Sequence, residues 1–500
     1  MVYDATKWPT RMNALDALFW SMDKVPELRS TIAALLILER PPTGERLHEE
    51  FERLSTELVR MHQRVVEVPF TLAPPEWVDD VQFDLDYHLR KLAVPAPGSM
   101  EDLLAALSPL YATAFDRDRP LWEVYVAEGL QDGRGAVFLK MHHCMLDGVG
   151  SSRLFQSLLR ERPAGGKTVP WAPEPRSTGP AALLWRATLH NMREGLRTGT
   201  EVMSAVSTAA LDPAPAGARI SSGLRMLSGL SRQLFAPRAR SPLHKPRSLS
   251  RRLSTFEMSL RDIDIVRAPV SATINDIVLT VVSGAMQRWH AGHGTEVQEL
   301  RALVPVNLRS EDEAEVGNRI AMLAIALPVG EADPLRRLRL IQQRVGEVKT
   351  DRRAKLYPLV AGAVYRFPLP LAEAIARQQT TSANFVCTNV PGPRQSYNLA
   401  GVPIEKIYPY TPLVGDHPLS IALFSYRESL YVGLDIDPLG MDDLPLFREA
   451  LEAAYREVLA MRRRPARPVD LRRRPPLRSR NGNGFARGAR GNGAHHTLHA

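Results

Sequence analysis

Apolar positions along the chain follow two different spacings, and the change from one to the other predicts a mixed α/β protein. Short apolar runs rich in β-branched and aromatic residues, typical of strands, occur at 31–38, 122–126, 135–143, 300–308, 319–327, 383–390, 419–426 and 430–436. Segments with apolar residues three and four positions apart, typical of helices, occur at 49–65, 151–160, 183–211, 221–234, 275–289, 334–349 and 441–461. Both kinds of segment occur in each half of the chain, which predicts layered α/β domains.

The spacing of prolines, glycines and charges divides the chain. Five hundred residues are too many for one ordinary core, and the proline- and glycine-rich stretch 161–180 reads as a linker or crossover. We therefore expect four regions: an N-terminal domain over 1–180, a helical connector over 181–250, a C-terminal domain over 251–460, and a basic, disordered tail over 461–500.

The net charge of +9 belongs to the tail, since residues 461–500 hold eleven arginines and one aspartate. The rest of the chain is near neutral, which argues against a nucleic-acid-binding body. The tail is either a solvated end or a contact for an anionic membrane surface or RNA. The two cysteines do not suggest a disulfide framework, and no apolar stretch approaches the length of a transmembrane helix. We expect any membrane contact to be peripheral and no nucleic acid to be bound.

Candidate chemistry is concentrated in the run from His142 to Gly148, which reads His-His-Cys-Met-Leu-Asp-Gly. The first residues end a predicted strand, where neighbouring side chains point to opposite faces, so only one histidine can face a given cleft. A histidine at a strand end is suited to act as a general base towards a hydroxyl, and Gly148 would let a substrate approach. Asp147 would hold the turn or orient an imidazole. The alternatives are a metal site, histidines that are hydrogen-bonded in the core, and a nucleophilic role for Cys144 rather than a small buried residue.

Other motifs stand in a recognisable order around this run, at 15–19 (LDALF), 118–123 (DRPLWE), 273–279 (TINDIVL), 304–309 (VPVNLR) and 388–393 (TNVPGP). With the HHxxxDG run, they resemble the bacterial wax ester synthase/acyl-CoA:diacylglycerol acyltransferase family over about residues 13–459. Thr388 stands where the family usually has serine, and Asn13-Ala14 where it usually has Ser-Pro. The resemblance implies two chloramphenicol-acetyltransferase-like α/β domains joined by a long helical connector.

The resemblance also assigns roles to residues. His143 would be the general base, His142 would shape the site or contact substrate, and Asp147 would be structural, with Arg309 as one candidate partner. Substrate contacts would come from Pro120, Leu121, Trp122, Asn275, Asp276 and Asn389. Read without the resemblance, Trp122 and Pro120 pack a core, Asn275 caps a helix with Asp276 in its first turn, and 389–393 is a turn.

The implied activity is transfer of a long-chain acyl group from acyl-CoA to diacylglycerol, a fatty alcohol or both. Acyl-CoA would be a cosubstrate, with no metal and no bound cofactor, and the protein would be cytoplasmic and peripherally associated with a membrane or lipid body. The helical segments 183–211 and 221–234 are candidates for that contact, or they pack on the domains. The alternatives are a carrier-bound or polyketide substrate on the same fold, and a catalytically silent lipid-body protein.

Overall fold

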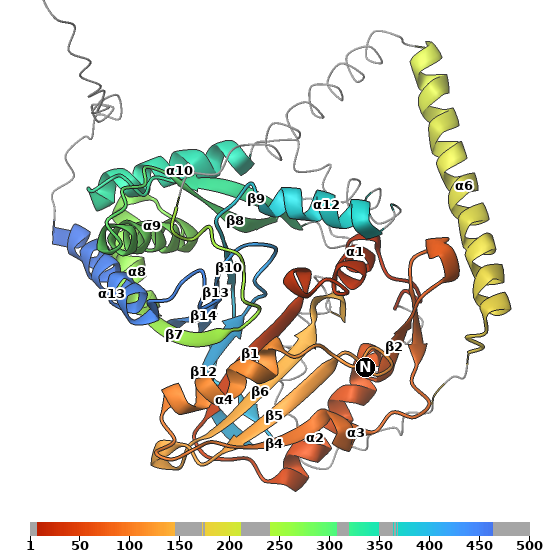
Figure 1. The fold of residues 1–500 in the computed structure, drawn as a ribbon, viewed down its shortest axis with the longest axis horizontal. Helices are drawn as coiled ribbons and strands as arrows, with labels where there is room; N and C mark the ends of the chain where they lie inside the picture. Colours follow the sequence, from red (N-terminus) through yellow and green to blue (C-terminus); the bar gives the residue numbers. More distant parts are fainter. Residues whose placement is uncertain are drawn as a thin grey trace, which may run out of the picture. The chain divides into compact units, whose positions relative to one another are not determined.

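The computed structural model describes residues 8–145, 173, 176–211, 241–307, 320–349, 364, 367 and 369–463. Within these residues the chain forms two six-stranded sheets and one two-stranded ribbon (Figure 1). The first sheet contains, in the order of neighbouring strands, β11 (Asn398–Leu399), β12 (Val402–Tyr410), β1 (Thr31–Leu38), β6 (Gly135–His142), β5 (Trp122–Glu128) and β4 (Leu89–Ala93). The ribbon pairs β2 (Gln63–Val66) with β3 (Glu76–Asp79).

The second sheet has both parallel and antiparallel neighbours. Its order is β7 (Arg252–Ser259), β14 (Ser429–Ile436), β13 (Leu419–Tyr426), β10 (Phe385–Val390), β8 (Leu300–Asn307) and β9 (Ile320–Leu327). The pairs β13–β10 and β10–β8 are parallel, and the others are antiparallel. Parallel neighbours need long connections. The connection from β8 to β10 contains helices, whereas the one from β10 to β13 contains β11 and β12.

The described helices are α1 (Ala14–Met22), α2 (Gly44–Glu57), α3 (Leu85–His88), α4 (Met100–Ala112), α6 (Pro180–Leu211), α8 (Leu260–Arg267), α9 (Ile274–Gly292), α10 (Pro334–Lys349), α12 (Leu369–Thr380) and α13 (Leu444–Ala460). α4 begins at a capping box, in which Ser99 and Asp102 satisfy each other's backbone N–H groups, and Thr273 and Asp276 do the same for α9. α9 packs against α10 and α13 and is buried along most of its length.

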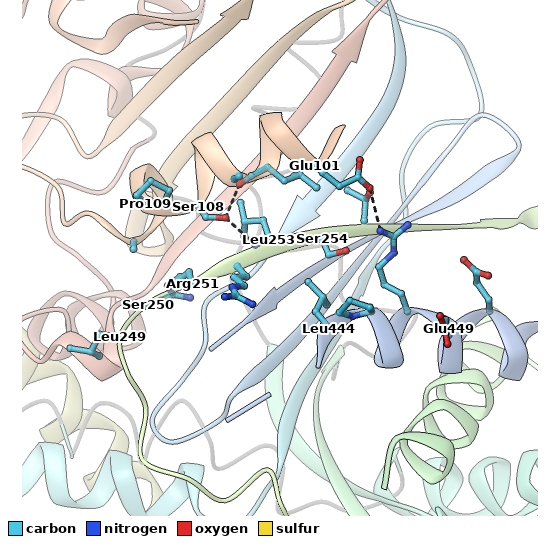
Figure 2. Close-up of a pocket in the computed structure, with 18 residues that line it drawn as sticks. Glu101, Ser108, Pro109, Leu249, Ser250, Arg251, Leu253, Ser254, Leu444 and Glu449 are labelled. Atoms are coloured by element: carbon cyan, nitrogen blue, oxygen red, sulfur yellow. Dashed lines mark hydrogen bonds and ion pairs between the residues drawn. The ribbon is translucent and has the colours of Figure 1, made fainter. Parts of the chain in front are cut away.

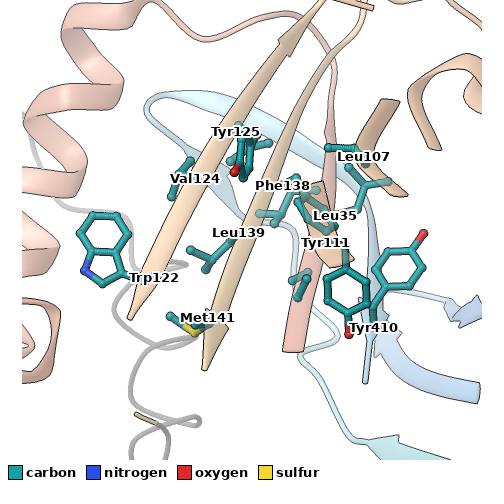
Figure 3. Packing of buried hydrophobic residues seen from close by; sticks show 14 of the residues in the cluster. Leu35, Leu107, Tyr111, Trp122, Val124, Tyr125, Phe138, Leu139, Met141 and Tyr410 are labelled. Carbon is teal, nitrogen blue, oxygen red and sulfur yellow. The ribbon is translucent and has the colours of Figure 1, made fainter. Parts of the chain in front are cut away.

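The core of the first sheet explains where the histidine run lies. Every residue of β6 is buried, because β6 is a central strand with packed side chains on both faces. Figure 3 shows Phe138, Leu139 and Met141 of β6 among the neighbouring apolar residues Leu35 and Tyr111. The packing of this strand therefore fixes the position of His142, its last residue, at one end of the sheet.

One predicted boundary needs correction. The C-terminal domain was expected to take all of residues 251–460, yet β11 and β12 belong to the first sheet, where Ala34 of β1 lies opposite Pro409 of β12. The chain thus leaves the second sheet after β10, adds two strands to the first, and returns at β13. Alternation of apolar residues predicts a strand but not the strand with which it pairs. The passage of β11 and β12 to the first sheet could therefore not be predicted from the sequence.

Most predicted strands and helices match the structure to within a few residues, but the helix expected over 49–65 is wrong. α2 ends at Glu57, a short 3-10 turn covers Val59–His62, and β2 follows. The helices expected over 151–160 and 221–234 and residues 464–500 of the tail lie outside the described residues. No single described helix is long and apolar enough to cross a membrane; Leu260–Val270 and Ile274–Gly292 meet that test only together, across a bend of 102°.

Candidate active site

The end of β6 separates the two adjacent histidines. The backbone N–H of His142 donates to the carbonyl of Leu121 at 2.9 Å, and that of His143 donates to the carbonyl of Ser30 at 2.8 Å. A 3-10 turn, His143–Met145, begins directly after the strand. The side chain of His142 is buried, whereas His143 is partly exposed. The two neighbours therefore differ in exposure, and which of them faces a cleft stays a prediction.

Buried polar groups fix the orientation of the His142 ring. Its Nδ1 accepts a hydrogen bond from the backbone N–H of Cys144 at 3.1 Å, which places the ring proton on Nε2. That Nε2 lies 3.2 Å from Oδ1 of Asp23, the residue that ends α1. Inside the core, His142 thus has a hydrogen bond at Nδ1 and a carboxylate close to Nε2, which indicates a supporting role for this residue.

Asp23 is itself held by several groups. Its Oδ1 accepts from the backbone N–H of Ser30 at 3.4 Å, and its Oδ2 lies 3.6 Å from Arg117. Burial by itself would raise the pKa of Asp23, but the hydrogen bond and charge of His142, together with Arg117, lower it below the ordinary value. Asp23 is therefore ionised at neutral pH. Since Ser30 also binds the backbone of His143, Asp23 connects to both histidines.

The ring of His143 has a different environment. It packs on Phe19 of α1 with 4.7 Å between ring centroids, and α1 contacts the turn that follows the strand. Burial, and then the neighbouring His142, lower the pKa of His143 to about 4. Among the described residues, its Nδ1 has no hydrogen-bond partner beyond the backbone of His143 itself. The imidazole is neutral at physiological pH, the protonation state that a general base requires.

Two residues from separate predicted motifs, Asn389 and Asn275, are hydrogen-bonded beside the second sheet. Nδ2 of Asn389, near the end of β10, donates to Oδ1 of Asn275 at 2.7 Å. Asn275 is exposed at the second position of α9, and the residue that caps this helix is Thr273, so the reading of Asn275 as the cap is wrong. Because its Oδ1 accepts from Asn389, the amide nitrogen of Asn275 keeps its donors for another partner.

The other residues that were predicted to contact substrate are buried in the structure. Asp276 is buried and completes the capping box of α9. Pro120, Leu121 and Trp122 are buried, and the indole N–H of Trp122 donates to the carbonyl of Met61 at 2.6 Å. These contacts agree with the reading in which the three residues pack the core, and their contact with substrate stays a prediction.

Some predicted positions lie outside the described residues, namely Asp147, Gly148 and Arg309. Cys144 is 3% exposed and burial raises its pKa, as expected for a small core residue rather than a nucleophile. Within the described part of the chain, no group of three or more His, Cys, Asp or Glu side chains is arranged to hold a metal.

A surface cavity of about 1030 Å³ lies elsewhere, between α4, the beginning of β7 and the beginning of α13 (Figure 2). Its lining includes Ser108, Arg251 and Leu444 and none of the predicted site residues. The N–H of Leu253 donates to the hydroxyl of Ser108 at 3.1 Å, so a hydrogen bond at the edge of this cavity connects α4 to β7.

Sequence reasoning missed the residues that support the histidines: Phe19, Asp23, Ser30 and Arg117. The motif at 15–19 marks the helix that carries Phe19, but Asp23 lies just beyond it. An aspartate after an apolar helix is usually a solvated end, and only the fold brings this one to a residue over a hundred positions away.

Comparisons with known proteins agree with the motifs. A model of the wax ester synthase/diacylglycerol acyltransferase catalytic domain matches residues 12–278, and a model of the C-terminal domain of that family matches residues 316–458. A probable diacylglycerol O-acyltransferase of Mycobacterium tuberculosis is 30% identical over 473 residues, covering 92% of this chain and 98% of the relative. The O-acyltransferase WSD of Acinetobacter baylyi is 30% identical over 377 residues, 72% of this chain and 77% of that protein.

Solved structures share the fold. The wax ester synthase/diacylglycerol acyltransferase from Marinobacter aquaeolei aligns with a TM-score of 0.60 at 23% identity, over 90% of this chain and 98% of that one. A trichothecene 15-O-acetyltransferase from Fusarium sporotrichioides aligns with a TM-score of 0.57 at 12% identity, over 90% and 95%. The predicted α/β fold with two acetyltransferase-like domains is confirmed.

Proposed function

This chain belongs to the wax ester synthase/diacylglycerol acyltransferase family, and we propose that His143 is the general base of its reaction. The protein is an O-acyltransferase that moves a fatty acyl group from acyl-CoA to diacylglycerol, a fatty alcohol or both. The observation that supports the proposal for His143 is its neutral, partly exposed imidazole, which follows a buried strand and stands next to a buried His142 that lies against Asp23.

In the proposed reaction, Nε2 of His143 removes the proton from the acceptor hydroxyl while the hydroxyl oxygen attacks the thioester carbonyl. The tetrahedral intermediate then collapses, the carbon–sulfur bond breaks, and the proton passes from His143 to the departing thiolate of coenzyme A. Proton transfer by a positioned base contributes roughly a hundred- to ten-thousandfold to the rate. No resident metal or cofactor takes part in this scheme.

The charge that develops on the thioester oxygen needs a donor. We assign this role to the amide nitrogen of Asn275, whose Oδ1 is already held by Asn389 and whose side chain is exposed. Asn389 then acts by orienting Asn275. Arg117 and Asp23 act further away, through the ring of His142.

The acceptors of this reaction are poorly soluble lipids, so we also propose that the protein works in the cytoplasm while bound peripherally to a membrane or lipid-body surface. The substrates would then be a long-chain acyl-CoA from solution and an acceptor from the lipid phase.

The test of the catalytic assignment uses the purified full-length protein with palmitoyl-CoA and either dioleoylglycerol or hexadecanol, with esters separated by thin-layer chromatography. We expect His143→Ala to lower ester formation by about a hundredfold or more, because the acceptor proton then has no positioned base. His48→Ala is the matched control, since the side chain of His48 is 44% exposed near Asp86. Full ester synthesis by His143→Ala would remove His143 from the mechanism.

A further inference from the structure

Exposed apolar side chains gather on one structural unit of the molecule. It consists of the beginning of α6 and the short 3-10 turn Pro69–Thr71 with the residue after it. Its exposed side chains, called the α6 surface below, are Phe70 (84% exposed), Leu72 (47%), Trp185 (65%), Met192 (59%) and Leu196 (71%). Single exposed apolar residues are ordinary, but a group on one element marks an interaction surface.

The α6 members of this surface form a continuous stripe. Trp185, Met192 and Leu196, with the partly exposed Leu189 between them, follow the spacing i, i+4, i+7 and i+11. At 100° per residue they fall within an arc of about 60°, and they extend for roughly 16 Å along the helix. This is the pattern of a helix that buries one face, yet Trp185, Met192 and Leu196 on this face are exposed in the part of the chain that the structure describes.

The opposite face of α6 is already packed. Ala187 is buried with Val68 and Ala73, and it lies about 170° around the helix from the centre of the stripe. Asn191 donates from Nδ2 to the carbonyl of Leu72 at 2.8 Å, and Arg186 pairs with Glu76 at 2.8 Å. These contacts fix the helix on the body of the protein and leave the stripe facing away from it.

The turn beside α6 exposes Phe70 in an unfavourable backbone conformation. Phe70 and Thr71 have φ angles of 58° and 51°, in the left-handed region that bulky residues rarely adopt. The neighbouring Val68 and Ala73 are buried, so the chain alternates between inward small apolar residues and an outward phenylalanine. Strained, exposed residues of this kind cluster at functional sites.

From these contacts we infer that the α6 surface docks on a lipid surface that carries anionic headgroups, with Trp185, Met192, Leu196 and Phe70 entering its interfacial layer. The inference rests on the proposed peripheral association. The exposed Arg193 lies beside the stripe, about 70° from its centre, where it would meet anionic headgroups. Tryptophan and leucine on one face of a helix with arginine at its flank are typical of helices that lie in a membrane interface.

The experiment compares two triple variants of the full-length protein. The first, Trp185→Ser/Met192→Ser/Leu196→Ser, removes the stripe. The second, Ile265→Ser/Leu371→Ser/Leu439→Ser, removes three exposed apolar side chains from other elements, with exposures of 46%, 49% and 48%. Both are measured by sedimentation with sucrose-loaded vesicles of phosphatidylcholine containing phosphatidylglycerol and diacylglycerol. Acyl transfer to a water-soluble alcohol is measured separately, so that a failed catalytic assignment is distinguishable from failed docking.

We expect the stripe variant to bind vesicles at least about tenfold more weakly and the control variant to bind like the unmodified protein. Phe70→Ser alone, with the helix untouched, should also weaken binding, which keeps the inference testable if the triple variant does not fold. Equal vesicle binding by both triple variants would overturn the inference, as would binding that is abolished by salt but unaffected by Phe70→Ser. A change from dimer to monomer in the stripe variant, seen by light scattering, would overturn it too, because the occupant would then be a second copy of the chain.

Discussion

His142 and His143 are adjacent in the chain but have different neighbours, because the strand ends between them. His142 keeps the geometry of β6 and enters the polar pocket formed by Asp23 and the backbone of Cys144. His143 begins the following turn and lies against Phe19, partly open to the surroundings. At this scale, Asp23 and the backbone of Cys144 set the tautomer of His142, and Ser30 holds the backbone of His143, the proposed base.

The role of Asp23 can be tested by removing its charge and then its hydrogen bond. Asp23→Asn keeps an acceptor near Nε2 of His142, whereas Asp23→Ala removes it, and Arg117 keeps its ion pair with Glu67 in both variants. We expect kcat to fall roughly tenfold in Asp23→Asn and about a hundredfold in Asp23→Ala, with KM for acyl-CoA little changed, because a displaced base slows chemistry more than binding.

A purely structural role for Asp23 would give a different result. Both variants would then contain less folded enzyme, and titrated active sites would show an unchanged kcat per site. Asp80→Asn serves as a control, because Asp80 is another buried aspartate that pairs with an arginine, Arg119, at 3.6 Å. It should leave kcat per active site unaltered.

At the scale of strands and helices, the two sheets are joined by the strand that changes sheet. Pro409 of β12 belongs to the first sheet, and its carbonyl oxygen lies over Gly433 of β14 in the second. A Cβ at position 433 would come within 1.8 Å of that oxygen. The glycine is therefore needed for the close approach of two backbones, and the contact joins the sheets without a side chain between them.

Gly433→Ala tests this contact directly. We expect it to destabilise the protein by about 1–3 kcal/mol, because the inserted methyl group forces β12 and β14 apart. Gly346→Ala is the matched control, since a Cβ there meets no atom within 4 Å and alanine favours α10. Urea unfolding monitored by circular dichroism should show a lower midpoint for the first variant and an equal or higher one for the second. Equal midpoints for both variants would show that β12 can move away at no cost.

The same elements show how much the sequence can reveal. Apolar periodicity located β1, β6 and most strands of the second sheet, because burial on both faces leaves a continuous apolar run. It could not show that β12 pairs with β1, since partner choice depends on contacts between distant residues. For the candidate site, the sequence singled out the histidine run and the pair Asn275 and Asn389, which the structure joins by a hydrogen bond, while their roles in the reaction stay predictions. It did not identify Asp23 or Ser30, whose roles arise only when α1 and β1 are brought against the end of β6.

For the molecule as a whole, buried titratable groups link stability to pH. Burial lowers the pKa of His62 and His88 to about 4, against 6.5 in the unfolded chain. Burial also raises the pKa of Asp435 to about 6, although Arg251 acts in the opposite direction. Below pH 6.5 the unfolded chain therefore binds more protons at the histidines than the folded protein does. Asp435 acts in the opposite direction between about pH 4 and pH 6, where the folded protein binds a proton at this carboxylate that the unfolded chain does not.

The sign of the effect follows from that difference in bound protons. Stability rises with pH wherever the unfolded state binds more protons, so the protein should lose stability as the pH falls from 6.5 towards 4. Each buried histidine contributes at most about 1.4 kcal/mol per pH unit in this window. His88→Gln should make the loss shallower, because an amide can keep the contact with the carbonyl of Trp122 but does not titrate. Compared with the unmodified protein, this variant should have a lower urea midpoint at pH 7, and its midpoint should fall less between pH 7 and pH 5. The control His48→Gln changes a 44% exposed side chain and should behave like the unmodified protein at both pH values. If His88→Gln loses stability between these pH values as steeply as the unmodified protein, His88 already carries its proton in the folded state.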